Sequence, residues 1–257
     1  MSRTVLFALI ASSPLVLGAY LGCRFTFPER LLAAVLAFAA GALITALTFE
    51  LFEESYEKGG AVRAALGLAL GAVVFTGASV LLDRYVAKDE DPDGSTKLDK
   101  DAATRERPAA SAAGSGSAGL ALLAAVTLDG VPENVALGIS LETAGGSLAL
   151  LAAIFASNLP ESLVGAASMR SQGKSTAYAV GLWSIAAVLL AGAVLLGAGP
   201  LSTVSDEAIS VPLAFAAGAV IASLADTLMP EAYEQGGPLV ALSTALGFVL
   251  SFLLATL

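Results

Sequence analysis

Long stretches without a charged residue recur along the whole chain, and they decide what it can fold into. A hydrocarbon core about 30 Å thick needs about 20 apolar residues in a helix to cross it. Eight windows of roughly that length occur in this 257-residue chain, whose mean hydropathy is +0.81. The sequence therefore predicts an all-α, polytopic membrane protein with eight transmembrane helices. The windows are 4–22, 31–49, 64–82, 108–128, 143–160, 175–205, 208–225 and 235–257.

Basic residues between the windows predict which side of the membrane each connection faces. Arginine and lysine concentrate in cytoplasmic loops. Ten basic residues fall in the connections of one side and three on the other, which places both termini outside a cell membrane. The ten are Arg24, Arg30, Arg84, Lys88, Lys97, Lys100, Arg105, Arg107, Arg170 and Lys174, and the three are Arg3, Lys58 and Arg63.

One long polar connection divides the chain. Residues 83–117 are charged and rich in Gly, Ser and Ala, a composition that cannot build a core. We expect a disordered cytoplasmic linker there, in preference to a segment that collects metal ions. It separates transmembrane spans 1–3 (1–82) from the central spans 4–5 (118–170), which spans 6–8 (171–257) follow.

Residues 37–60 and 214–237 are two versions of one segment. AFAAGALITALTFELFEESYEKGG and AFAAGAVIASLADTLMPEAYEQGG are identical at 14 of 24 positions without a gap. They end the second and the seventh spans, so we expect spans 6–8 to duplicate spans 1–3. The copies are displaced by five spans, an odd number, and must therefore cross the membrane in opposite directions, as in many secondary transporters. The expected architecture is a 3+2+3 arrangement with an inverted repeat.

The two central spans carry isolated carboxylates in matching motifs. AVTLDGVPENVALGISL (125–141) aligns with AIFASNLPESLVGAASM (153–169), with Pro132 over Pro160 and Glu133 over Glu161. An acidic side chain at the centre of a membrane helix costs about 2.5–3.5 kcal/mol on insertion scales. Such residues need a compensating partner.

Helical spacing places further oxygen atoms beside both glutamates. Residues four or three apart share one face of a helix, as Asp129 and Glu133 do in one span. Each proline lacks an N–H and frees a backbone carbonyl one turn earlier. If the two spans pack side by side, their carboxylate, amide, hydroxyl and carbonyl oxygens converge on a cation site. The predicted metal ligands are Asp129, Glu133, Ser157, Asn158 and Glu161.

DGVPEN and SNLPES resemble the paired fourth- and fifth-span motifs of the ZIP (Zrt/Irt-like protein) family of divalent metal transporters, whose usual form is His-Asn-x-Pro-Glu-Gly. The eight spans, the long loop after span 3, the outside termini and the 3+2+3 repeat agree with that family over essentially the whole chain. The resemblance implies that the family's metal-binding positions fall on Asp129, Gly130 and Glu133 in span 4 and on Ser157, Asn158 and Glu161 in span 5.

The ends of the duplicated segments resemble a second motif of the family, His-Leu-Leu-Pro-Glu-Ala. TLMPEA at 227–232 places Glu231 over the glutamate, and ELFEES at 50–55 places Glu50 and Glu54 over acidic or imidazole positions. In the predicted orientation, Glu50 and Glu54 gather ions at an outside entrance. Asp226 and Glu231 release them at an inside exit.

The chain departs from the family because it contains no histidine and carries Gly130 in place of an asparagine. An all-oxygen site favours Mn²⁺, Mg²⁺ or Fe²⁺ more than a histidine site does, whereas the resemblance implies zinc. The expected function is transmembrane transport of zinc, manganese or iron(II), with the ion as substrate and no prosthetic group. The expected partners are the lipid bilayer and the ion, without nucleic acid, and a homodimer stays open.

Two other functions stay open beside transport. The loss of imidazole is compatible with a metal sensor or a transport-dead homologue. An intramembrane hydrolase would use Asp129 with Glu133 or Glu161 as an acid–base pair, but no Gly-x-Gly-Asp signature supports it. We therefore do not expect an enzyme.

Overall fold

The computed structural model describes residues 2–90, 116–143 and 148–256, and every regular element in these ranges is a helix, as the sequence predicts. Long α-helices are interrupted by short π-helical and 3-10 turns. The elements are α1 (Ser2–Arg24), α2 (Glu29–Ala46), η1 (Leu47–Phe52), α3 (Glu53–Glu90), α4 (Gly116–Thr143), α5 (Leu148–Ser171), α6 (Thr176–Ala198), η2 (Leu201–Thr203), α7 (Asp206–Ser223), η3 (Leu224–Leu228), α8 (Met229–Gly236) and α9 (Leu239–Ala255).

Five helical stretches in the described residues are long and apolar enough to cross a membrane, where the sequence analysis counted eight windows. One stretch of 54 residues covers two predicted windows, because the helix continues from α2 through η1 into α3. The apolar α9 is shorter than the other spans, and α4, which contains the charged DGVPEN segment, is not among the five. The stretches are Arg3–Arg24, Glu29–Leu82, Leu148–Ser171, Thr176–Ala198 and Asp206–Glu234.

The predicted linker 83–117 falls mostly outside the described residues. α3 continues to Glu90, inside the predicted linker, and α4 begins at Gly116. Residues 91–115 lie between them and are not described.

Two irregular backbone features occur at matching positions of the repeated segment. A π-helical turn begins at Leu47 in the first version and at Leu224 in the second, and these leucines are aligned. Each version ends at a glycine with positive φ, Gly60 at 76° and Gly237 at 57°. Because glycine lacks a Cβ, it adopts this conformation without strain, and the chain changes direction there. Both versions of the segment therefore share one backbone design.

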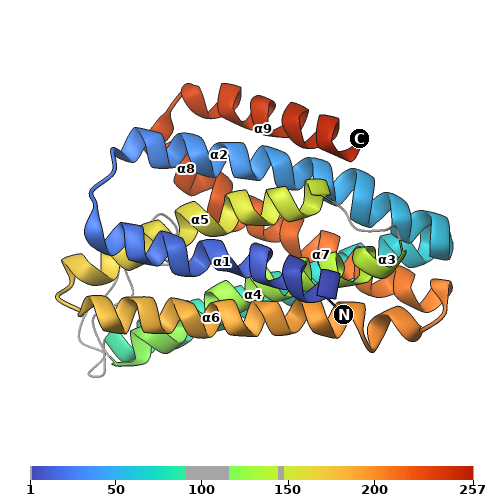
Figure 1. Cartoon of the computed structure of the whole chain (residues 1–257), viewed down its shortest axis with the longest axis horizontal. Helices are drawn as coiled ribbons and strands as arrows, with labels where there is room; N and C mark the ends of the chain where they lie inside the picture. Colours follow the sequence, from blue (N-terminus) through green and yellow to red (C-terminus); the bar gives the residue numbers. More distant parts are fainter. Residues whose placement is uncertain (1, 91–115, 144–147, 257) are drawn as a thin grey trace.

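The helices pack in two groups (Figure 1). In the first group, α1 packs on α5 and α6, and α4 packs on α6. In the second group, α3 packs on α7, and α2 packs on α9 and α8. Contacts of α2 with α5 and of α4 with α7 join the groups.

Glycines allow the closest helix pairs to touch through their backbones. A Cβ at any of four positions in the second group would overlap a carbonyl oxygen of the neighbouring helix, so only glycine permits the approach. Equivalent positions of the two repeated segments make equivalent contacts. Gly41 and Phe38 of α2 contact α9, and the residues aligned with them, Gly218 and Phe215 of α7, contact α3. The glycine–carbonyl pairs are Gly41 with Thr244, Gly247 with Phe38, Gly218 with Leu68 and Gly71 with Phe215.

The first and last helices reach the same end of the bundle (Figure 1). The start of α1, the end of α9 and the α6–α7 connection lie there, whereas the α1–α2 and α5–α6 connections lie at the opposite end. The second end therefore carries the basic residues of those two connections, including Arg24 and Arg170.

Candidate functional site

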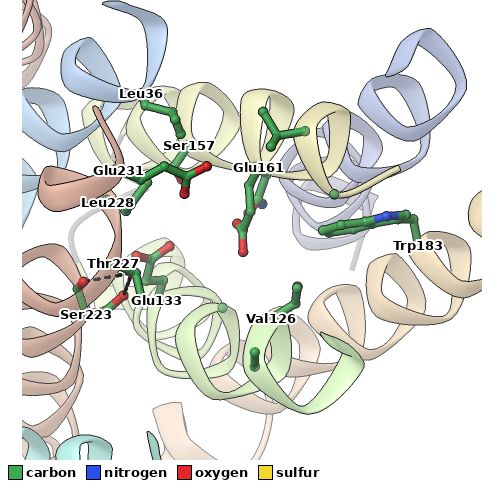
Figure 2. A pocket seen from close by; sticks show the side chains of 15 residues that line it. Leu36, Val126, Glu133, Ser157, Glu161, Trp183, Ser223, Thr227, Leu228 and Glu231 are labelled. Carbon is green, nitrogen blue, oxygen red and sulfur yellow. Dashed lines mark hydrogen bonds between the residues drawn. The ribbon is translucent and has the colours of Figure 1, made fainter. Parts of the chain in front are cut away.

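A cavity of about 80 Å³ lies where the two helix groups meet (Figure 2). Side chains from α2, α4, α5, α6, α7, η3 and α8 line it. One water molecule needs roughly 10–15 Å³ on the same measure, so the cavity has room for an ion and several waters. One of its lining elements, α8, lies toward the end of the bundle that also holds the α1–α2 connection (Figure 1).

Four of the five predicted metal ligands line this cavity: Glu133 on α4 and Ser157, Asn158 and Glu161 on α5. Glu133 is 6% exposed, Ser157 and Asn158 are also buried, and Glu161 is half-buried. The two helices do not pack side by side as assumed from the sequence. They face each other across the cavity, because α4 packs mainly on α6 and α5 mainly on α1.

The fifth predicted ligand, Asp129, has a side chain outside the described part of the structure. Its neighbour Gly130, which stands at the family's asparagine position, does line the cavity. A Cβ on Gly130 would lie 2.5 Å from Cδ1 of Leu190, so the leucine side chain fills the space that an asparagine would need. An amide ligand cannot enter at position 130 unless Leu190 moves.

Three neutral polar side chains of the cavity donate hydrogen bonds to backbone carbonyls. The Ser157 hydroxyl donates to the Ile154 carbonyl at 3.0 Å, and the Thr227 hydroxyl donates to the Ser223 carbonyl at 2.8 Å. The Asn158 amide nitrogen donates to the Ala11 carbonyl of α1 at 3.1 Å, which leaves its Oδ1 as an acceptor. The oxygens of Ser157 and Asn158 can accept from a ligand, whereas Thr227 Oγ1 also lies 3.4 Å from Ser223 Oγ, and either of these two hydroxyls could be the donor.

The residue after each glutamate holds the backbone of its own motif. Asn134 Nδ2 donates to the Gly130 carbonyl, and Ser162 Oγ donates to the Asn158 carbonyl, both at 2.8 Å and both four residues back. Ser162 also donates to Pro14 of α1 at 3.1 Å. These bonds do not replace the missing N–H donors of Pro132 and Pro160, which would bond the carbonyls of Leu128 and Ala156.

The predicted exit residues separate in the structure. Glu231 lines the cavity, as do Ser223 and Thr227, which the sequence analysis did not single out. Asp226 is not among the lining residues, and its Oδ2 accepts a hydrogen bond from Ser79 of α3 at 2.9 Å. The sequence did hold one signal for Thr227, because it aligns with the predicted entrance residue Glu50.

The predicted entrance residues do not line the cavity. Glu50 is half-buried in η1, and Glu54 lies 3.8 Å from Lys58, which forms a shorter ion pair of 2.7 Å with Asp206 of α7. Next to this cluster, Ser55 and Ser210 each donate to the other's carbonyl at 2.8 Å. The first version of the segment is therefore tied to the start of α7.

The acidic groups of the cavity do not converge on a single point. No set of three or more His, Cys, Asp or Glu side chains close enough to hold a metal ion occurs among the residues that the structure describes. Glu133, Glu161 and Glu231 instead surround one shared space (Figure 2). An ion bound there would keep part of its water shell or draw the side chains inward.

The wall of the cavity on the α6 side is Trp183, which is 2% exposed. Its indole Nε1–H has no hydrogen-bond partner in the described structure. A buried donor without an acceptor costs about 1–3 kcal/mol. Trp183 gave no signal in the sequence analysis, because only the approach of α6 to α5 brings it to the cavity.

Comparison with known proteins does not assign the chain to a family. No protein-family model matches the chain, and no curated protein matches its sequence. The resemblance to the ZIP family therefore depends on the quoted motifs and their spacing.

Proposed function

We propose that the chain carries divalent cations across a membrane, as a transporter or channel that resembles the ZIP family. The ion binds between α4 and α5 through Glu133, Ser157, Asn158 and Glu161, with Asp129 as a further ligand. The observation that carries the proposal is the cavity between the two helix groups, where the buried Glu133 and the half-buried Glu161 lie together with the side-chain oxygens of Ser157 and Asn158.

Charge in the cavity favours a cation over other ligands. The described residues that line it include three glutamates and no lysine or arginine. Carboxylates removed from water need a positive partner or a proton. Oxygen ligands of this kind suit Mn²⁺, Mg²⁺ and Fe²⁺, and the motif resemblance adds Zn²⁺. The substrate is therefore zinc, manganese or iron(II).

We also propose eight spans in a 3+2+3 arrangement with an inverted repeat. Three features support it: the π-helical turns at aligned leucines, the positive-φ glycines at aligned ends and the equivalent glycine contacts. A fourth feature is the pairing of the remaining helices. A Cβ on Gly22 of α1 would overlap the Leu163 carbonyl of α5. In the same way, a Cβ on Gly197 of α6 would overlap the Val135 carbonyl of α4. Leu163 and Val135 are aligned in the central motifs.

The orientation follows from the basic residues. Glu231 of α8 lines the cavity, and α8 lies toward the end of the bundle that carries Arg24 and Arg170, which we assign to the cytoplasm. Glu50 and Glu54 lie toward the other end, with both termini outside. In this assignment Glu231 lines the inside part of the cavity, and alternating access requires a movement of one helix group against the other.

Flux measurements with the purified full chain in proteoliposomes test the proposal. Entry of Mn²⁺ or Zn²⁺ should be saturable and should be lost when Glu133 and Glu161 are both replaced by Gln. Protons compete with the ion for carboxylate oxygens, so entry should also slow as the medium is acidified. Binding without flux would indicate a sensor or an inactive homologue, and cleavage of a peptide without ion binding would indicate a hydrolase. Either result would refute transport.

A further inference from the structure

Trp183 is the only tryptophan of the chain, and its indole forms one wall of the cavity. The indole N–H can donate a hydrogen bond but cannot accept one. It is buried without a partner in the described structure, in the wall of a cavity that acceptor oxygens also line. A donor cannot bind a cation, but it can bind an oxygen atom of a ligand to that cation.

Gly165 brings the nitrogen-bearing edge of the indole against α5. A Cβ on Gly165 would lie 2.5 Å from Cζ2 and 3.4 Å from Cε2 of Trp183, and Cε2 is bonded to Nε1. Any larger residue at position 165 would therefore push the indole away. Gly165 follows Glu161 by four residues, so both lie on the same face of α5, and both line the cavity.

Of the three glutamates that line the cavity, Glu161 is the one that Figure 2 draws next to Trp183. In the view of Figure 2, Glu161 lies between Trp183 on one side and Glu133 and Glu231 on the other. A carboxylate has about four lone-pair sites, which suffice for a metal ion, an N–H donor and its other contacts together. Trp183 and Glu161 also belong to the same helix group, so a movement between the groups would not separate them.

We propose that Trp183 is a positioning residue of the cation site, whose indole N–H donates a hydrogen bond to the Glu161 carboxylate when the ion is bound. The proposal rests on the proposed function, because it requires an ion in the cavity. The hydrogen bond fixes the orientation of a ligating carboxylate. Outer hydrogen-bond partners of metal ligands act in this way.

The single tryptophan makes the bond directly observable. The full chain labelled with ¹⁵N in detergent micelles has one indole N–H resonance. Adding Zn²⁺ should move that resonance downfield as the bond forms, and Glu161→Gln should reduce the shift. Trp183→Phe keeps an aromatic ring and removes the donor, so Zn²⁺ affinity measured by calorimetry should fall about 10–100-fold.

Leu190→Ala is the matched control for packing. Leu190 is buried on α6 against Gly130 of the cavity, but it has no donor to lose. Its substitution should reduce thermal stability and leave Zn²⁺ affinity within a few fold of wild type. An equal loss of affinity in both variants would reduce Trp183 to a packing role and overturn the proposal.

The indole N–H resonance of the wild-type chain tests the proposed hydrogen bond even if Trp183→Phe does not fold. An indole resonance that stays in place while calorimetry records Zn²⁺ binding would overturn the positioning role and leave the proposed function intact. Absence of any binding of Zn²⁺, Mn²⁺ or Mg²⁺ to the wild-type chain would overturn both together.

Discussion

Residues 47–60 and 224–237 follow the same backbone path and meet different neighbours. Each begins with a π-helical turn and ends at a positive-φ glycine. In the second stretch, Thr227 and Glu231 line the cavity. In the first stretch, Glu54 lies beside Lys58, which is paired with Asp206, and no residue lines the cavity.

The difference shows that the repeated sequence determines the backbone, whereas the surrounding helices determine the role of each side chain. Glu54 and Glu231 occupy aligned positions and are both acidic. One lies 3.8 Å from a lysine, and the other lines a cavity without basic residues in its described wall. We infer that only the second contributes to ion binding in this state of the protein.

The largest expected effect separates these two glutamates. Glu231→Gln removes a carboxylate from the cavity, and ion affinity should fall by about 10–100-fold, the loss typical of a missing partner around a metal site. Glu54→Gln removes only one of the two acidic neighbours of Lys58 and should leave affinity unchanged. Competition for bound Mn²⁺ in detergent measures both. Equal losses in the two variants would contradict the distinction between the two stretches.

Much of this arrangement follows from the sequence, and the parts that do not follow have two different physical causes. Helical spacing and the paired Pro-Glu motifs predicted that Glu133, Ser157, Asn158 and Glu161 belong together, and all four line one cavity. Beyond residue 224 the backbone departs from a regular α-helix, which the sequence did not predict. A π-helical turn has a wider repeat than an α-helix, so the side chains after it are rotated from their expected direction.

Asp226 and Thr227 both lie in this π-helical turn. Asp226 was one of the two predicted exit residues, and it bonds Ser79, whereas the other, Glu231, lines the cavity together with Thr227, which was not singled out. The position of Trp183 at the cavity could not be predicted from the sequence for a different reason. It depends on the small size of Gly165 on another helix, a contact that no local pattern encodes.

The next effect tests what the two versions share. Gly41→Ala and Gly218→Ala each force a methyl group against a carbonyl of the partner helix, Thr244 or Leu68. Such overpacking costs about 1–3 kcal/mol, and the two costs should be similar. Thermal unfolding in detergent measures the loss, with Gly192→Ala as control because no atom lies within 4 Å of a Cβ there. A loss confined to one variant would mean that the two interfaces are not equivalent.

A smaller effect concerns the neutral oxygen of the second stretch. Thr227→Val keeps the shape of the side chain and removes the hydroxyl, which should weaken ion binding by about fivefold if the oxygen contributes about 1 kcal/mol. Thr48 is the matched control. Its hydroxyl donates to Ile44 at 2.8 Å, four residues back as in Thr227, but it is exposed and does not line the cavity. Thr48→Val should bind ions like wild type, and a parallel decrease would point to the helix turn instead of the oxygen.

The smallest effect concerns the ion pair that ties the first stretch to α7. Asp206→Asn removes the closer partner of Lys58, but the Asp206 side chain is 73% exposed, so the loss of stability should be only about 0.2–1 kcal/mol. Salt screens exposed charges, and the difference from wild type should shrink between 0.05 M and 1 M NaCl, across which the Debye length falls to about 3 Å. Glu29→Gln is the control. Glu29 lies at the same offset of 177 residues in the first turn of α2, and no ion pair of Glu29 occurs in the described residues. Thermal unfolding of Glu29→Gln should match that of wild type at both salt concentrations. If the stability loss of Asp206→Asn persists at high salt, Asp206 acts through packing or helix capping and not through Lys58.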